Sequence, residues 1–212
     1  MKPIFACVLR LGGDYIPEHV QFLAAQVKAN TIINHDFVCY TDYKGEIPGV
    51  KSIPLINDWP GWWAVPEVYR TVGPTVVVGV DTVIHGNIDG LFRIAQGSKP
   101  DEFWMIRAFR PPARTISGIM AWNGDWSWLY DEFDYEKQSR NLRGEEDYTN
   151  LQLKKRGIQP KAIQDVYPFV YSWKRHCQKQ GIPASCKVLV FHGKPRPHEV
   201  PEIWEPIKVR YS

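Results

Sequence analysis

Residues 75–81 (TVVVGVD) constrain the fold of this chain more than any other segment. They are apolar and rich in β-branched side chains, and they do not alternate with polar residues. A strand with this pattern is buried on both faces, as strands at the centre of a parallel sheet are. The segment ends on a carboxylate, Asp81. It therefore predicts a central strand whose carboxyl end presents an acidic side chain.

The N-terminal segments predict a parallel sheet around that strand. Apolar residues recur at helical spacing after Pro17, a residue that the first turn of a helix tolerates. This helix lies between two apolar runs, so strand, helix and strand form a βαβ unit with a right-handed crossover. We expect strands at 4–10, 35–42 and 50–56, and the helix at 17–29.

The rest of the chain continues as a mixture of strands and helices. We expect strands at 83–89, 103–109, 117–122 and 187–192, and helices within 57–70 and at about 125–133 and 146–156. Three prolines within 193–202 predict no regular structure there. No repeat or linker divides the 212 residues. The sequence predicts one α/β domain, 1–212, with a mixed, mostly parallel sheet flanked by helices.

Composition excludes several classes of protein. The formal net charge of +3 suits an anionic small molecule and is too small to indicate a nucleic-acid partner by itself. No segment reaches the roughly 18 apolar residues of a membrane span, and the N-terminus lacks a signal-peptide pattern. The four cysteines form no CxxC pair, and their spacing with His176 and His192 matches no common zinc site. We expect a cytoplasmic protein without a membrane span.

Three polar residues follow apolar strands that we expect to be parallel: Arg10, Asp42 and Asp81. Ligands of open parallel sheets bind outside the carboxyl ends of the strands, so these side chains should face one crevice. The alternative for Arg10 and Asp42 is that they cap turns or pair with each other.

Several ordered motifs resemble one enzyme family. Residues 76–92 read VVVGVDTVIHGNIDGLF, where that family has an apolar strand, a DxD motif and a polar turn. Similar elements occur in the same order at 7–13 (CVLRLGG), 37–42 (FVCYTD), 60–63 (PGWW), 117–125 (SGIMAWNGD), 144–153 (GEEDYTNLQL) and 191–197 (FHGKPRP). Together they resemble the GT-A glycosyltransferases, nearest to the glycogenin-like, bacterial galactosyltransferase-like group. The resemblance implies a single-domain GT-A, Rossmann-like fold.

The resemblance also implies a reaction and a cofactor. A glycosyltransferase of this group moves a sugar from a nucleoside diphosphate sugar, most often a UDP-sugar, to an acceptor. A divalent cation, Mn²⁺ or Mg²⁺, meets the negative charge that develops on the departing phosphate. The implied metal ligands are Asp81 and His192, with Gly193 and Lys194 beside the diphosphate. Alone, His192 also fits an ordinary histidine at a strand end.

Two positions depart from the family pattern. Gly79 stands where the family has the first Asp of DxD, and Val65 stands where many relatives carry Lys. A metal ligand and a phosphate-facing cation are therefore missing. This leads to a second hypothesis, a protein that binds sugar nucleotides without catalysing transfer.

Other side chains are candidates for contacts with the donor or acceptor. We expect Arg10 and Asp42 near the base and ribose. Trp62 and Trp63 either stack on a substrate or fill the core. Asp147, with Glu146 as the second choice, is our candidate for contact with the transferred sugar or acceptor, and so for the catalytic group. Asp147 is also an ordinary residue for a helix N-terminus.

Basic residues form three groups along the chain. They are Arg107, Arg110 and Arg114, then Arg140 and Arg143, and then residues 154–156. A solvated face explains each group. If several lie beside the crevice, they suit a polyanionic acceptor such as DNA or a phosphorylated glycan. A third hypothesis is therefore a transferase that glycosylates modified nucleic-acid bases.

Overall fold

The computed structural model describes residues 1–110 and 114–211. The strands are β1 (Ile4–Leu9), β2 (Asp36–Thr41), β3 (Lys51–Pro54), β4 (Thr75–Val78), β5 (Thr82–Ile84), β6 (Phe103–Arg107), β7 (Thr115–Trp122), β8 (Lys161–Ala162), β9 (Val170–Ser172) and β10 (Val188–Val190). The α-helices are α1 (Pro17–Ala29), α2 (Asp89–Gly97), α3 (Trp128–Asp131), α4 (Tyr135–Asn141), α5 (Glu145–Lys155) and α6 (Pro201–Tyr211). Shorter helical segments are η1 (Gly61–Arg70), η2 (Ile163–Asp165), η3 (Trp173–Cys177) and η4 (Pro197–Glu199).

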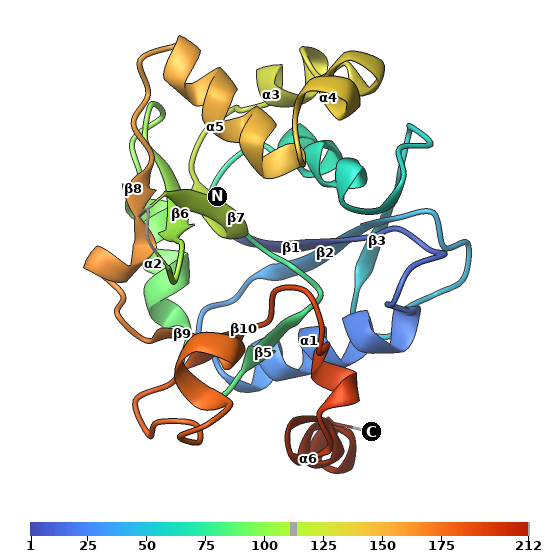
Figure 1. Ribbon diagram of the computed structural model, residues 1–212, viewed down its shortest axis with the longest axis vertical. Helices are drawn as coiled ribbons and strands as arrows, with labels where there is room; N and C mark the ends of the chain where they lie inside the picture. The colour runs from blue at the N-terminus through green and yellow to red at the C-terminus, as the bar shows by residue number, and fades with distance from the viewer. Residues whose placement is uncertain (111–113, 212) are drawn as a thin grey trace.

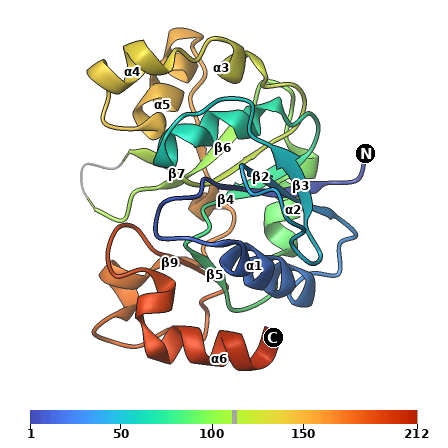
Figure 2. The same cartoon turned by 90° about the vertical axis from the view of Figure 1, so that its right-hand side faces the viewer.

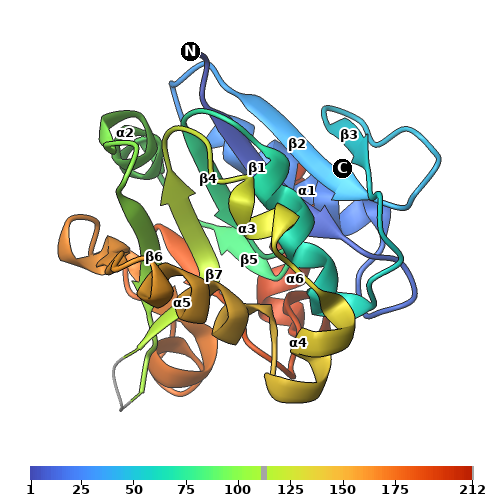
Figure 3. The ribbon, with the colours of Figure 1, turned by 90° about the horizontal axis from the view of Figure 1, so that it is seen from above.

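The main sheet has seven strands in the order β3-β2-β1-β4-β7-β6-β8. Figure 3 shows β2, β1, β4 and β7 following one another across it. The pairs β2/β3, β1/β2, β1/β4 and β6/β8 are parallel, whereas β7 runs antiparallel to both β4 and β6. The strand predicted to be central, β4, is the fourth of the seven and is fully buried. The prediction of a mixed, mostly parallel α/β sheet is confirmed.

Helices cover both faces of this sheet (Figure 2). Alternate residues of β1 point to opposite faces: Phe5 and Cys7 pack with α1 and α2, whereas Ala6 packs with η1, β6 and α5. Among residues 1–110 and 114–211, no helix combines the length and the apolar character needed to cross a membrane.

A second sheet, β5-β10-β9, lies on the α1 side of the main sheet (Figure 1). After β4 the chain turns at residues 79–81 and enters this second sheet as β5. Gln26 of α1 fixes that exit, because its buried side chain accepts a 2.9 Å hydrogen bond from the backbone N–H of Ile84. The direction of the chain on either side of Asp81 is therefore determined by both sheets.

The structure corrects several predicted elements. The strands expected at 83–89 and 187–192 are only three residues long, and 89–97 is the helix α2. The segment 193–202 is not irregular throughout, because η4 occupies Pro197–Glu199 and α6 begins at Pro201. Proline fits there because the first turn of a helix needs no backbone donor from it. α6 covers β10 and α1 through Ile203 and Ile207.

We predict that Gln26→Leu destabilises the protein while conserving side-chain volume. The backbone N–H of Ile84 would lose its acceptor inside the protein, which costs about 1–3 kcal/mol of unfolding free energy. Denaturant unfolding measures this change. The control is Lys28→Ala on the exposed face of α1, which should change stability by no more than about 0.5 kcal/mol. Equal effects of the two substitutions would contradict the assignment.

Candidate functional site

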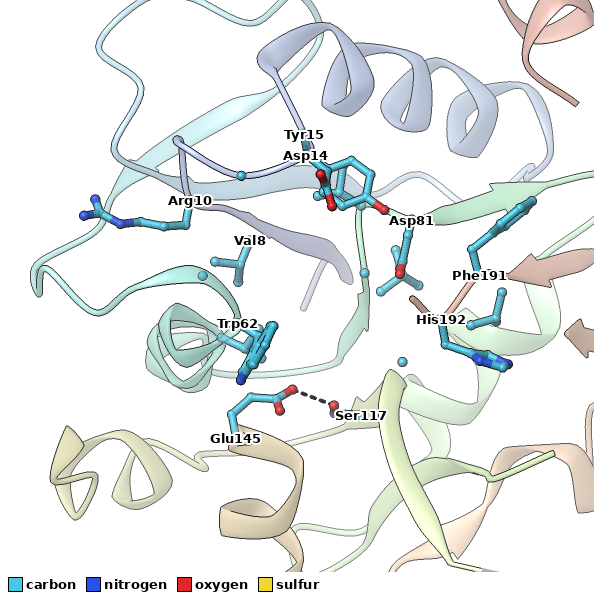
Figure 4. Close-up of a pocket in the computed structure, with 18 of the residues that line it drawn as sticks. Val8, Arg10, Asp14, Tyr15, Trp62, Asp81, Ser117, Glu145, Phe191 and His192 are labelled. Carbon is cyan, nitrogen blue, oxygen red and sulfur yellow. Dashed lines mark hydrogen bonds between the residues drawn. The ribbon is translucent and has the colours of Figure 1, made fainter. Parts of the chain in front are cut away.

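A cleft of about 540 Å³ lies at the carboxyl ends of β1 and β4. One wall is formed by the turn after β4 and by the segment that follows β10, and the other by β7 and the start of α5. Figure 4 shows Asp81 on the first wall and Glu145 on the second, with Trp62 near Glu145. This is the position that the strand-end rule predicts for a ligand site in an α/β sheet.

Asp81 lies in the turn between the two sheets, and its carboxylate folds back over Gly79. A Cβ atom at position 79 would clash with a carboxylate oxygen of Asp81, so the glycine makes this conformation possible. The backbone carbonyl of Asp81 accepts a 3.3 Å hydrogen bond from the N–H of Phe191, which ties the turn to the end of β10. Burial raises the pKa of Asp81 to about 6, and the nearby Arg196 opposes this shift.

Arg196 is the cation that faces Asp81, and it was not among the candidates from the sequence. Its guanidinium lies 4.0 Å from the Asp81 carboxylate and donates a 2.9 Å hydrogen bond to Asp14. It also lies over the ring of Tyr15, 5.4 Å from the centroid. The Tyr15 hydroxyl is buried without a hydrogen-bond partner among the described residues, and Figure 4 shows it pointing toward Asp81. Cationic and neutral hydrogen-bond donors thus meet at one point of the cleft.

The expected pair of metal ligands is not arranged to share an ion. The Nε2 atom of His192 lies 2.7 Å from the Ser172 hydroxyl, and its ring stacks on Phe109. Figure 4 shows this ring turned away from Asp81. Among the residues that the structure describes, no three His, Cys, Asp or Glu side chains form a group that could hold a metal. Asp81 faces the guanidinium of Arg196, and His192 faces Ser172, so the two expected ligands have different partners.

The opposite wall carries two carboxyl groups. Glu145 is buried and accepts a 2.6 Å hydrogen bond from the Ser117 hydroxyl. Burial raises its pKa to about 7. Glu146 also lines the cleft, and it forms a 2.6 Å ion pair with Arg114. Glu146 was a sequence-based candidate and Glu145 was not, although both belong to the same GEED run.

Asp147, our first sequence-based candidate for catalysis, lies outside the cleft lining. Its carboxylate accepts hydrogen bonds from Arg114 at 2.9 Å and from Arg143 at 3.4 Å. Because Arg114 also pairs with Glu146, Asp147 helps to position that arginine beside the cleft.

The nucleotide-binding candidates separate into two sets. Arg10 lines the cleft and pairs with Asp42 at 2.5 Å, and Asp42 also accepts a hydrogen bond from the N–H of Leu11. Arg10 also pairs with Asp58. Asp42 is not among the lining residues. Its carboxylate holds Arg10 in place, so the pairing of these two residues, one of the alternatives that the sequence left open, is present.

The tryptophan pair and the two residues after His192 also divide into one residue that lines the cleft and one that does not. Trp62 lines the cleft and is 61% exposed, whereas Trp63 is buried in the core against Phe133. Trp63 therefore does not face a ligand in the cleft. Gly193 lines the cleft with φ +73°, which glycine adopts without strain. Lys194 is outside the lining and pairs with Glu199 at 2.7 Å.

The comparisons with known proteins identify the fold. The chain matches no protein-family model and no curated protein sequence. Its structure is similar to a crystal structure of the glycosyltransferase GlyE from Streptococcus pneumoniae TIGR4, with a TM-score of 0.68 and 15% identity over 98% of this chain. The apo form of GlyE matches with the same TM-score and 12% identity over 99% of the chain. The chain spans 60% of the length of each GlyE structure, and the similarity establishes a glycosyltransferase fold.

We predict that Glu145 makes the stability of the protein depend on pH. Its folded-state pKa of about 7 lies above its ordinary value of 4.5, so the folded protein keeps a proton that the unfolded chain releases. The unfolding free energy should therefore fall by about 3 kcal/mol as the pH rises from about 4.5 to 7.

Denaturant unfolding of Glu145→Gln at several pH values tests this prediction. The variant should lose that part of the fall, because it carries no carboxyl group at position 145. The control, Glu136→Gln on the exposed surface of α4, should keep the wild-type slope. A Glu145→Gln protein with an unchanged slope would contradict the assignment.

Proposed function

We propose that this protein transfers a glycosyl group from a nucleoside diphosphate sugar, a UDP-sugar in our proposal, to an acceptor hydroxyl. The observation that supports this most directly is the pairing of Arg196 with Asp81 in a cleft at the end of the central strand. A glycosyltransferase fold and a facing wall of carboxyl groups are consistent with the same reaction.

In our proposal, Arg196 meets the charge on the leaving group. When the bond between the anomeric carbon and the diphosphate oxygen breaks, its electron pair stays on the diphosphate. A guanidinium forms strong, charge-assisted hydrogen bonds with phosphate oxygens, and Tyr15 offers a neutral hydroxyl donor next to it. The bound diphosphate then replaces Asp14 as the anionic partner of Arg196. Gly193 leaves room for the phosphate to approach the backbone.

Asp81 and Glu145 have different tasks in this proposal. Asp81 accepts hydrogen bonds from donor hydroxyl groups on the Arg196 wall. Glu145 takes the proton from the acceptor hydroxyl as its oxygen bonds to the anomeric carbon. A carboxyl group with a pKa of about 7 is suited to accept a proton at neutral pH. Glu146 lies beside it in the cleft, where Arg114 fixes its side chain.

The remaining contacts concern the nucleotide and the sugar. We propose that Arg10, held by Asp42, lies near the base and ribose, and that the exposed ring of Trp62 stacks on a sugar.

The cytoplasm is our proposed location. It agrees with the free thiols of Cys7 and Cys39, which lie opposite each other on β1 and β2.

A second candidate function is binding of the sugar nucleotide without transfer. The two departures from the family pattern, Gly79 and Val65, both line the cleft. Because neither residue is charged, the cleft lacks a carboxylate and a cation at these two positions. Slow hydrolysis of the donor that is lost in Glu145→Gln would support transfer. Donor binding with no turnover in the presence of any acceptor would support the second candidate.

We predict that donor binding does not require a divalent cation and does require Arg196. A panel of nucleoside diphosphate sugars should raise the thermal stability of the protein equally with EDTA and with Mn²⁺. Arg196→Met should weaken donor affinity about 10- to 100-fold, the effect of losing a charge-assisted hydrogen bond.

The matched control for Arg196 is Arg140→Met, which removes an exposed arginine of α4 that pairs with Glu136. This variant should bind the donor like the wild type. Binding that appears only with Mn²⁺ would refute the role of Arg196, and failure of every nucleotide sugar to bind would refute the proposed function.

A further inference from the structure

A second cavity, of about 660 Å³, lies between α5 and the strands β6, β7 and β8. These elements occupy one side of the molecule (Figure 1). Among the described residues, the lining includes one carboxylate, that of Asp165, and four cationic side chains, those of Arg107, Arg114, Lys154 and Lys161. Carboxylates next to the lining, Glu102, Glu146 and Asp147, pair with Lys161 and Arg114, so an anion would have to displace these partners and would meet at Lys154 a charge that is unpaired within 1–110 and 114–211.

The ion pairs of these cations can exchange with a ligand. Arg107 pairs with Asp165 at 2.5 Å, and both side chains are about half exposed. Lys161 pairs with Glu102 at 2.7 Å on the surface. Exposed pairs of this kind contribute only about 0–1 kcal/mol, so an anion can compete with them. Lys154 is exposed and forms no ion pair with the described residues.

The side chain of Trp104 lines the same cavity. Its indole Nε1 is buried and has no hydrogen-bond partner among the described residues. The ammonium group of Lys161 lies over the ring, 5.2 Å from its centroid. The cavity thus combines cationic donors with an aromatic ring.

This cavity and the cleft share two elements. On β7, Thr115 lines the cavity and Ser117 lines the cleft. On α5, Glu146 lines the cleft, while Asn150 lines the cavity one turn later. These separations are about 6–7 Å along each element. Arg114 lies at the boundary, because it lines the cavity and pairs with Glu146.

We propose that this cavity binds the phosphate group of a phosphorylated glycan acceptor while the acceptor hydroxyl lies in the cleft. The proposal rests on the proposed glycosyl transfer. A phosphate suits the site because it has enough oxygens for several cations, more than a carboxylate has.

The arrangement favours a discrete anionic group over the extended backbone of a nucleic acid. The remaining basic groups of the sequence do not extend the cavity into a track. Arg140, Arg143 and Arg156 are not among the described residues that line it.

Calorimetric titration of the full chain with a hexose 6-phosphate and with the parent hexose tests this proposal. The phosphorylated probe should bind the wild type more tightly than the hexose does. Lys154→Met should weaken its binding about 3- to 10-fold, about 0.7–1.4 kcal/mol. The matched control is Lys155→Met, which removes the same charge from the next residue of α5 without altering the cavity lining. Its affinity should stay within about twofold of the wild type.

Two further titrations separate the possible failures. UDP should bind wild type and Lys154→Met equally, since Lys154 does not line the cleft. If UDP binds but the hexose 6-phosphate shows no dependence on Lys154, only the cavity assignment is wrong. If UDP does not bind the wild type, the proposed function fails and the acceptor role fails with it. A DNA oligonucleotide tests the alternative partner. If it binds more tightly than the hexose 6-phosphate, and if Lys154→Met and Lys155→Met weaken its binding equally, the proposal is overturned in favour of nucleic acid.

Discussion

The partly buried carboxylate of Asp81 beside the guanidinium of Arg196 is the interaction on which the rest of the site depends. Asp81 ends the central segment of the sheet, whereas Arg196 follows the last strand, so their approach requires both sheets to be in place. Arg196 also contacts Asp14 and Tyr15 in the loop after β1. One cation thus joins three chain segments at the point where a diphosphate is proposed to bind.

The cleft has two chemically different walls because different elements form them. One wall brings the Arg196 cation to Asp81, while the other brings Glu145 and Glu146 from the first turn of α5. Burial raises the pKa of both Asp81 and Glu145, but only Asp81 has a facing cation that opposes the shift. This asymmetry suits a reaction in which one wall stabilises a leaving anion and the other accepts a proton.

Local sequence patterns predicted the centre of the fold but only part of the site. The apolar run of β4 and the helical spacing of α1 are local signals; α1 spans the predicted residues, whereas β4 begins at Thr75 as predicted but ends at Val78, before Asp81. α6 was missed because its prolines resemble those of a loop, although packing on β10 and α1 stabilises it. Arg196 lies within the 191–197 motif but was not singled out there, since its partners lie about 115 and 180 positions earlier in the chain. Trp63 and Asp147 were candidates because of their residue types. In the structure Trp63 is buried in the core and Asp147 pairs with Arg114.

The most direct test of the central claim is a crystal structure of the protein grown with UDP and Mn²⁺. Our account predicts that the diphosphate lies in the cleft with its oxygens within hydrogen-bonding distance of the Arg196 guanidinium, and with His192 still bonded to Ser172. A metal ion held jointly by Asp81, His192 and the diphosphate, with Arg196 displaced from the phosphates, would contradict it.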